Sequence, residues 1–163
     1  MKTETDFIPN SFSKNLESGT FTWSAPSNIA LVKYWGKKAN QIPANPSVSF
    51  TLNTCKTITQ LSFQTKANQD SFSFDLFFEG KPKEDFKPKI QKFFERIEIY
   101  CPFLKQYHFT IDTQNTFPHS SGIASSASGM AALAMNIMSL EKALNPEMTE
   151  DYFNQKASFL ARL

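Results

Sequence analysis

The sequence predicts an α+β domain in which a mixed or mostly antiparallel sheet is covered by helices on one side. Two observations carry this prediction. In the first half of the chain, apolar residues tend to recur at every second position, which is typical of strands with one buried face. From residue 90 onward they recur mainly at spacings of three and four, which is typical of amphipathic helices. Apolar residues make up 40% of the chain, enough for a packed interior.

The N-terminal region divides into an arm, a strand region and a loop. Residues 1–17 are polar and aperiodic, and we expect them to form a flexible N-terminal arm. Strand character begins near Phe21, with a break at Pro26 before a second apolar segment. Residues 36–47 contain Gly, Pro and Asn and are expected to form a loop. Strand character then resumes in VSFTL (residues 48–52) and in KTITQLSFQT (residues 56–65), where alternate residues share one face of the pleat: Thr57, Thr59, Leu61 and Phe63.

The clearest alternation is SFSFDLFFEG at residues 71–80. Its large apolar side chains share one side of the predicted strand: Phe72, Phe74, Leu76 and Phe78. The sequence ANQD, at residues 67–70, joins this strand to the preceding one. We therefore expect the two strands to form an antiparallel hairpin.

The second half of the chain has helical spacing interrupted by one strand. An apolar stripe over residues 90–101 predicts a helix that Pro102 ends. The segment 107–113 returns to a period of two, and residues 127–144 predict a long helix. Thr149 is the expected N-cap of a last helix, which reaches the end of the sequence without a stop signal. We expect the sequence to be the front part of a longer protein, although a chain can also end within a helix.

Charge and cysteine content exclude several classes of protein. A formal charge of +2 is too small for general binding to nucleic acids. The two cysteines have neither metal-ligand spacing nor the density of a secreted disulfide scaffold, which favours reduced thiols. The chain also lacks an apolar leader and any apolar run long enough to span a membrane. We expect a soluble cytoplasmic protein without a nucleic-acid or membrane partner.

A loop of small residues, PHSSGIASSASG at residues 118–129, precedes the long predicted helix. The N-terminus of a helix attracts anions, and small side chains let phosphate oxygens approach the backbone. Small residues also allow a helix to pack closely on a sheet, and the pattern leaves this alternative open. The chain contains no GxxxxGK[ST] sequence, so a P-loop fold is not expected.

The loop resembles the phosphate-binding loop of the GHMP kinase superfamily. APSNIALVKYWGKK at residues 25–38, followed by IPANPSVSFTL at residues 42–52, resembles the signature of the diphosphomevalonate decarboxylase family. FFEGKP, at residues 77–82, extends the resemblance. It implies that residues 18–163 form a GHMP-kinase-type N-terminal domain, of the ribosomal protein S5 domain 2-like fold, truncated before the rest of the enzyme.

Members of this family use ATP and Mg²⁺ to convert 5-diphosphomevalonate into isopentenyl diphosphate by phosphorylating the 3-hydroxyl and releasing phosphate and carbon dioxide. The resemblance implies that Lys33 lies near the reacting oxygen and carboxylate and is catalytic. It implies that Tyr34 and Lys37 hold the substrate's diphosphate. Asn28 begins the motif and is either a substrate contact or a turn former.

The same resemblance assigns the nucleotide phosphates to the small-residue loop. Ser125 and Ser126 are expected to contact the phosphates, with Ser126 also touching the metal. Gly122 and Ala124 are expected to supply backbone amides. Ser120 and Ser121 occupy positions where many relatives carry alanine, so their hydroxyls are expected to be incidental.

The family's catalytic aspartate lies far downstream of the region matched here. Its position is not matched by Asp70, Asp75, Asp85, Asp112 or Asp151. The expected partner is therefore the C-terminal part of the same enzyme, and the chain alone is expected to be inactive. The sequence also leaves open that the protein forms a homodimer.

Two other functions remain open. The first is a GHMP small-molecule kinase or decarboxylase that acts on mevalonate or its monophosphate. The second is a non-catalytic ligand-binding fragment that retains the loop without the chemistry.

Overall fold

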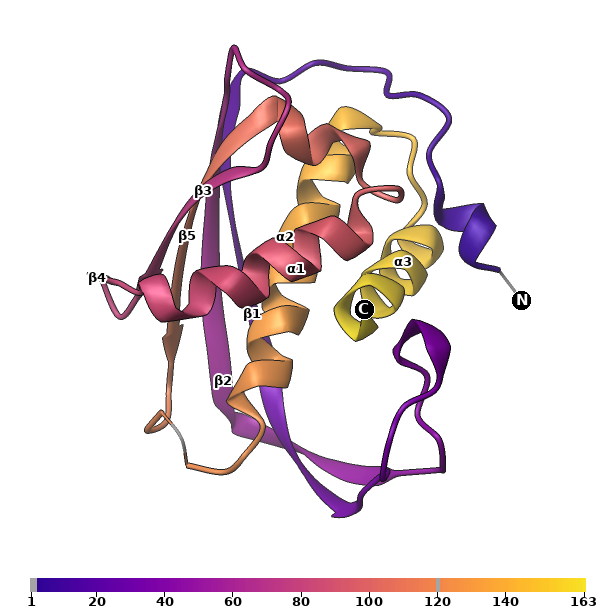
Figure 1. The fold of residues 1–163 in the computed structure, drawn as a ribbon, viewed down its shortest axis with the longest axis vertical. Helices are drawn as coiled ribbons and strands as arrows, with labels where there is room; N and C mark the ends of the chain where they lie inside the picture. Colours follow the sequence, from indigo (N-terminus) through magenta and orange to yellow (C-terminus); the bar gives the residue numbers. More distant parts are fainter. Residues whose placement is uncertain (1–2, 120) are drawn as a thin grey trace.

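The computed structural model describes residues 3–119 and 121–163, without the side chain of Asn40. A five-stranded sheet in the order β1-β2-β5-β3-β4 is covered on one side by three helices (Figure 1). The strands are β1 (Ser18–Val32), β2 (Val48–Thr65), β3 (Ser73–Phe78), β4 (Lys81–Pro82) and β5 (Tyr107–Asn115). The helices are α1 (Lys87–Ile97), α2 (Ser125–Leu144) and α3 (Glu150–Arg162). The 3₁₀ helices are η1 (Glu4–Phe7), η2 (Ala39–Gln41), η3 (Glu84–Phe86) and η4 (Pro102–Gln106). The predicted α+β class, with a mixed sheet and helices on one side, is confirmed.

The two longest strands, β1 and β2, form an antiparallel ladder that changes register near its middle. Pro26 is opposite Lys56, whereas Ser27 is opposite Leu52. The break predicted at Pro26 is therefore an irregularity within one strand. Beyond it, the ends of both strands sweep away from the rest of the sheet (Figure 1). We call this part of the ladder, residues 27–32 and 48–52, the distal arm.

The predicted hairpin between β2 and β3 is wrong. β5 lies between them, antiparallel to β2 and parallel to β3. The alternation identified both strands and their buried faces, but a strand with one buried face can pair with any strand whose face matches. The decisive partner, β5, comes about thirty residues later in the sequence.

The core lies between the sheet and the helices. Residues at alternate positions of the central strands are fully or nearly fully buried: Leu61, Phe63, Phe109 and Ile111. The aromatic rings of Phe94 in α1 and Phe109 lie 5.8 Å apart in an edge-to-face arrangement. α1 ends at Ile97, earlier than the predicted stripe, because turns follow before the buried Cys101.

The two C-terminal helices begin and end close to the predicted positions. α2 begins at Ser125 and ends at Leu144. Thr149 caps α3, since its hydroxyl accepts a hydrogen bond from the Tyr152 amide at 3.2 Å. Among the described residues, no helix combines the length and the apolar character needed to cross a lipid bilayer.

The N-terminal segment packs on the helices. Phe7 is buried, and its ring stacks on that of Phe159 in α3 with centroids 4.9 Å apart. The backbone amides of Ser13 and Lys14 both donate to the Leu144 carbonyl, at 3.1 and 3.0 Å. These contacts give residues 3–17 a defined position, while the flexibility expected for this arm stays a prediction.

One ion pair is buried between α2 and α3. The Lys156 ammonium lies 2.6 Å from a Glu141 carboxylate oxygen and donates to the Tyr100 carbonyl at 2.8 Å. Both side chains are almost completely inaccessible. Burial raises the pKa of Glu141, and the opposing effect of Lys156 does not cancel it. Desolvation therefore outweighs the attraction at this carboxylate.

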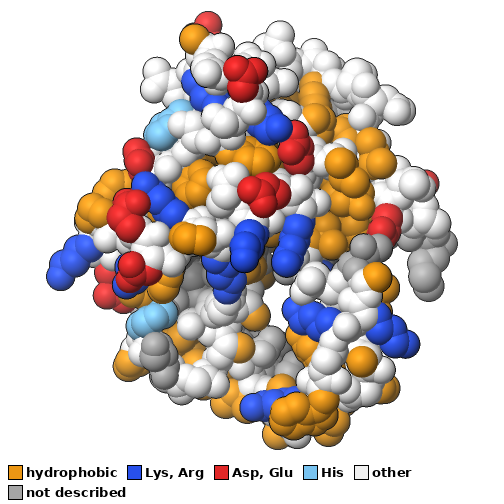
Figure 2. Space-filling view, viewed as in Figure 1, with side chains coloured by type: hydrophobic (Ala, Val, Ile, Leu, Met, Phe, Trp, Pro, Cys, Tyr) orange, Lys and Arg blue, Asp and Glu red, His pale blue; other side chains and the backbone are white. Residues whose placement is uncertain are grey.

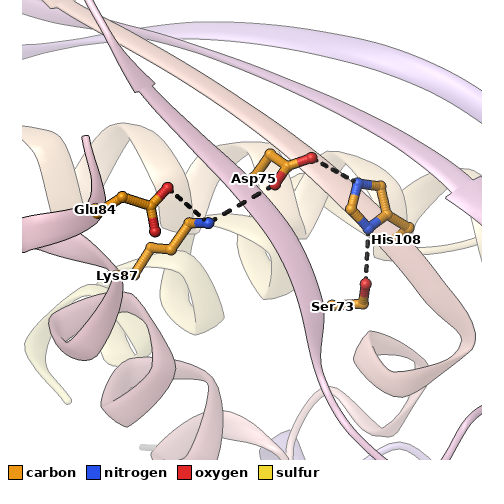
Figure 3. Close-up of polar contacts among 5 residues, drawn as sticks. All are labelled: Ser73, Asp75, Glu84, Lys87 and His108. Atoms are coloured by element: carbon orange, nitrogen blue, oxygen red, sulfur yellow. Dashed lines mark hydrogen bonds and ion pairs between the residues drawn. The ribbon is translucent and has the colours of Figure 1, made fainter. Parts of the chain in front are cut away.

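On the other face of the sheet, β3 and β5 carry several polar side chains. Figure 3 shows His108 of β5 between two side chains of β3: its Nδ1 lies 2.7 Å from the Ser73 hydroxyl, and its Nε2 lies 3.4 Å from an Asp75 oxygen. Lys87, at the start of α1, contacts Glu84 at 2.9 Å and Asp75 at 3.7 Å. Its contacts with Glu84, and secondarily Asp75, raise the pKa of Lys87. Since these groups are at least partly exposed to solvent, the network has little weight for stability.

Candidate active site

The two sequence motifs meet where the distal arm begins. The Ser27 hydroxyl donates to the Ile123 carbonyl, which joins residues 96 positions apart in the chain. Next to it, the hydroxyls of Thr57 in β2 and Ser128 in α2 lie 2.6 Å apart and are buried. These contacts attach the small-residue loop to β1 and β2, and they place the strand that carries Asn28 beside it.

The start of α2 has the features of an anion site. Ala124 precedes the helix with φ of 59°, and Gly122 has φ of 79°. The left-handed region is costly for alanine, so contacts such as the hydrogen bond from Ser27 to the neighbouring Ile123 carbonyl have to hold it there. A Cβ at Gly122 would meet no atom within 4 Å, so its backbone angle is the reason for glycine at this position. No described side chain caps this helix end, which leaves it accessible to a ligand.

The loop between β1 and β2, residues 33–47, is folded on itself by hydrogen bonds from Asn45. The Asn45 side-chain oxygen accepts from the Trp35 amide at 2.8 Å, and its amide group donates to the Lys33 carbonyl at 3.3 Å. Lys37 donates to the side-chain oxygen of Gln41 at 2.7 Å. The loop thus presents Lys33, Tyr34 and Lys37 on the surface, each at least partly exposed.

This loop turns back to the side of the sheet that the helices cover, below α3 (Figure 1). Figure 2 shows the surface hollowed between the lobe at lower right and the body of the domain, with blue side chains on the rim. The segment from Ser18 to Gln69 contains five lysines and no Asp or Glu. Its charge is therefore purely positive, which suits a strongly anionic ligand.

A cavity of about 240 Å³ lies beside the start of α2. Strands β2, β3 and β5 and helices α1 and α2 form most of its wall, and most of the surface of this wall is apolar. The wall includes Leu76, Phe78, Phe86, Ile90, Ile111 and Met130. Ser125, Ser126 and Lys89 also line it. An apolar pocket beside an anion site suits a ligand that joins a flat ring to phosphates.

Lys89 and His119 are the site residues that the sequence did not predict. The Lys89 ammonium of α1 donates to the Ser126 hydroxyl. The His119 ring contacts those of Phe78 and Phe86, with centroids 5.1 and 5.7 Å apart. Lys89 and Ser126 lie 37 positions apart on different helices, and no sequence periodicity relates residues that far apart, so only the folded chain reveals this contact.

The structure groups the predicted residues into two sets. The first set is at the start of α2: Gly122, Ala124, Ser125 and Ser126. The second set is on the loop that follows β1: Lys33, Tyr34 and Lys37. Asn28, half-buried and opposite Thr51 in the ladder, lies on the strand between them. Ser120 is outside the described residues.

The donors near α2 suit a magnesium ion that is held mainly by phosphate. In the described part of the chain, no three His, Cys, Asp or Glu side chains gather around a common point. Mg²⁺ commonly keeps several waters and binds through substrate phosphates with few protein ligands. The exposed Ser126 hydroxyl could serve as one such ligand.

Comparison with a family model and comparison with individual proteins indicate the same family. Residues 25–162 match the family described as the diphosphomevalonate decarboxylase-like N-terminal domain. Diphosphomevalonate decarboxylase of Candida albicans is 37% identical over 141 residues, which cover 78% of this chain and 37% of that protein. The chain thus spans little more than a third of the length of this relative.

Two solved structures are similar in fold. Mevalonate diphosphate decarboxylase from Staphylococcus aureus superposes with a TM-score of 0.66 at 28% identity, over 88% of this chain and 41% of that one. A structure described as MDDEF in complex with MVAPP, AMPPCP and magnesium gives a TM-score of 0.64 at 29% identity, over 89% of this chain and 43% of that one.

Proposed function

Because the chain belongs to the diphosphomevalonate decarboxylase-like N-terminal domain family, we propose that it supplies the nucleotide-phosphate site and the substrate lysines of an ATP-dependent decarboxylase in the cytoplasm. The substrate is 5-diphosphomevalonate, and the product is isopentenyl diphosphate. The observation that carries the proposal is the Ser27–Ile123 hydrogen bond, because it joins the strand leading to Lys33 and Lys37 to the phosphate loop.

We propose that ATP places its phosphates at the start of α2 and its base in the adjoining cavity. The amides of Gly122 and Ala124 and the hydroxyls of Ser125 and Ser126 then face the phosphate oxygens. The apolar walls, including Phe78 and Met130, would exclude water from the base. Bound Mg²⁺ would neutralise phosphate charge, with Ser126 as its protein ligand.

The substrate lies along the strand between the two sets of residues. Tyr34 and Lys37 hold its diphosphate, and Asn28 contacts its body. Lys33 offsets the negative charge around the 3-oxygen and the carboxylate during phosphoryl transfer and carbon dioxide loss. Concentrated positive charge is required there, since two phosphorylated molecules and a carboxylate come together. The family's catalytic aspartate comes from polypeptide outside the matched region.

The test is a chimaera in which residues 25–162 of this chain replace the matched region of the Candida albicans relative. We expect ATP-dependent release of carbon dioxide from the 5-diphosphate, and none from mevalonate or its 5-phosphate. ADP formation from either of these two without carbon dioxide would identify a kinase. A folded chimaera, checked by circular dichroism, that is inactive on all three would instead favour a non-catalytic fragment.

Ser126→Ala is expected to weaken ATP binding to the 163-residue chain by roughly tenfold, because one hydrogen bond to a charged phosphate is removed. Calorimetric titration with ATP and Mg²⁺ measures the change. Ala127→Ser provides the control, since it adds a hydroxyl at the next exposed position of the same helix. Equal affinities for wild type and Ser126→Ala would remove the assignment of Ser126 to the phosphates.

Lys89→Met should also lower the affinity for ATP by roughly tenfold, and the loss should shrink at high salt because a charge is removed. The same titration, run at two ionic strengths, measures both effects. Lys92→Met is the matched control, as Lys92 is exposed on α1 but does not line the cavity. If the two variants behave alike, Lys89 has no specific part in the nucleotide site.

A further inference from the structure

Exposed large apolar side chains are concentrated in one short part of the molecule. Among residues 3–119 and 121–163, ten are strongly exposed, and eight of these lie between residues 29 and 50. They are Ile29, Leu31, Val32, Tyr34, Trp35, Ile42, Val48 and Phe50. Single exposed apolar residues are normal on a protein surface, but a continuous group of them marks an interaction site.

The ladder gathers four of these side chains on one face of the distal arm. Ile29 is opposite Phe50, and Val32 is opposite Val48. Residues directly opposite in an antiparallel pair point to the same face, and so do Val48 and Phe50 because they are two positions apart. The opposite face carries small and polar residues, including the pair Ala30 and Ser49. The arm is therefore amphipathic, although its apolar face is uncovered.

The edge of the sheet adds to this surface. β1 is the first strand in the sheet order, and no described strand pairs with its outer side. A long edge strand next to apolar side chains favours association, and proteins usually cover such an edge or protect it with charge. Trp35, at 81% exposure, follows directly in the loop.

We propose that the apolar face of the distal arm is the docking surface for the polypeptide that makes up the remainder of a diphosphomevalonate decarboxylase. The proposal rests on the proposed function, and it names the partner that completes that site. The Candida albicans relative has nearly two thirds of its length outside this match. The arm also carries the strand that leads to Lys33 and Lys37, so a partner seated on it lies beside the substrate residues.

The experiment is co-expression of the tagged 163-residue chain with the part of the Candida albicans enzyme that follows the matched region. Size-exclusion chromatography with light scattering measures the assembly. We expect a 1:1 complex with the wild-type chain. Val48→Ser combined with Phe50→Ser should reduce the captured partner at least tenfold. Ile99→Ser is the matched control, since Ile99 is 58% exposed but lies outside the arm, and it should retain the complex.

A second measurement uses Trp35, whose loop position makes it independent of strand pairing. In a Trp23→Phe background, the fluorescence of Trp35 should shift to shorter wavelength when the partner binds. Wild-type and doubly substituted chains should have the same circular dichroism and melting temperature, because the changed side chains are exposed. If the double substitution unfolds the chain, Trp35→Ala replaces it and should weaken capture.

Three results would overturn the docking surface: no complex with the wild-type chain, equal capture by the double variant, or a homodimer of this chain that the double variant abolishes. The last would assign the face to a second copy. These failures are distinct from failure of the proposed function. A complex that depends on the distal arm but releases no carbon dioxide supports the docking surface and refutes the decarboxylase activity.

Discussion

Lys156→Met is expected to lower the free energy of unfolding by about 3–5 kcal/mol, because it leaves the Glu141 carboxylate buried without its partner. Of the hydrogen bonds described for this carboxylate, the weak contact with the Cys101 thiol at 3.9 Å would remain. Since the free energy of unfolding of a domain is typically about 5–15 kcal/mol, this loss is a large fraction of the total stability. Urea unfolding of the 163-residue chain, followed by circular dichroism, measures the loss.

The control is the double variant Lys156→Met with Glu141→Leu, which removes both charges. Because burial already raises the pKa of Glu141 despite Lys156, the intact pair is not expected to stabilise the fold over an apolar pair. The double variant should therefore recover most of the lost stability or exceed the wild type. A single variant within 1 kcal/mol of the wild type, on the scale of an ordinary substitution, would show that the pair is solvated in solution.

Lys33→Met in the Candida albicans chimaera is expected to lower turnover by about 100- to 1,000-fold, the range for removing one positioned group that stabilises transition-state charge. Methionine keeps most of the length of the side chain and removes the ammonium group, with its charge and its hydrogen-bond donors. The backbone contact between Asn45 and the Lys33 carbonyl does not involve the substituted atoms. Steady-state measurement of carbon dioxide release gives kcat and KM separately.

Lys37→Ala separates binding from chemistry. It should raise the KM for the 5-diphosphate and leave kcat nearly unchanged, because Lys37 is assigned to the part of the substrate that does not react. Lys38→Met tests whether loss of any positive charge from this loop weakens substrate binding, and it should leave both kcat and KM nearly unchanged. If Lys33→Met changes only KM, Lys33 binds substrate and the catalytic assignment is wrong.

The sequence predicted the elements of this fold better than their partners. Periodicity identified the helix with Ile90, Phe93 and Phe94 on its buried face, and Thr149 marked the start of α3 correctly. These features depend on neighbours a few residues apart. The β2–β3 hairpin was wrong, because strand pairing is decided by contacts between distant segments, and the alternation of β3 fits β5 as well as β2.

The same division holds for the candidate site. The small-residue loop and the lysine motif are continuous stretches of sequence, so they could be identified before the fold was known. The contact of Lys89 with Ser126 and the cavity bounded by Phe78 and Met130 depend on how α1 packs over α2 and the sheet. No local pattern contains that information, and the expected contacts of Lys33, Tyr34 and Lys37 with substrate remain predictions.

The central place of β5 has a consequence for synthesis on the ribosome. β2 and β3 are translated well before the strand that separates them, so until residue 115 has left the exit tunnel β2 has only β1 as a neighbour in the main sheet and β3 lacks its parallel partner. During this interval, an aromatic-rich segment such as SFDLFF is open to wrong pairing. Slow translation before β5 would prolong that exposure, and a chaperone that shields residues 48–78 would increase the yield of folded protein.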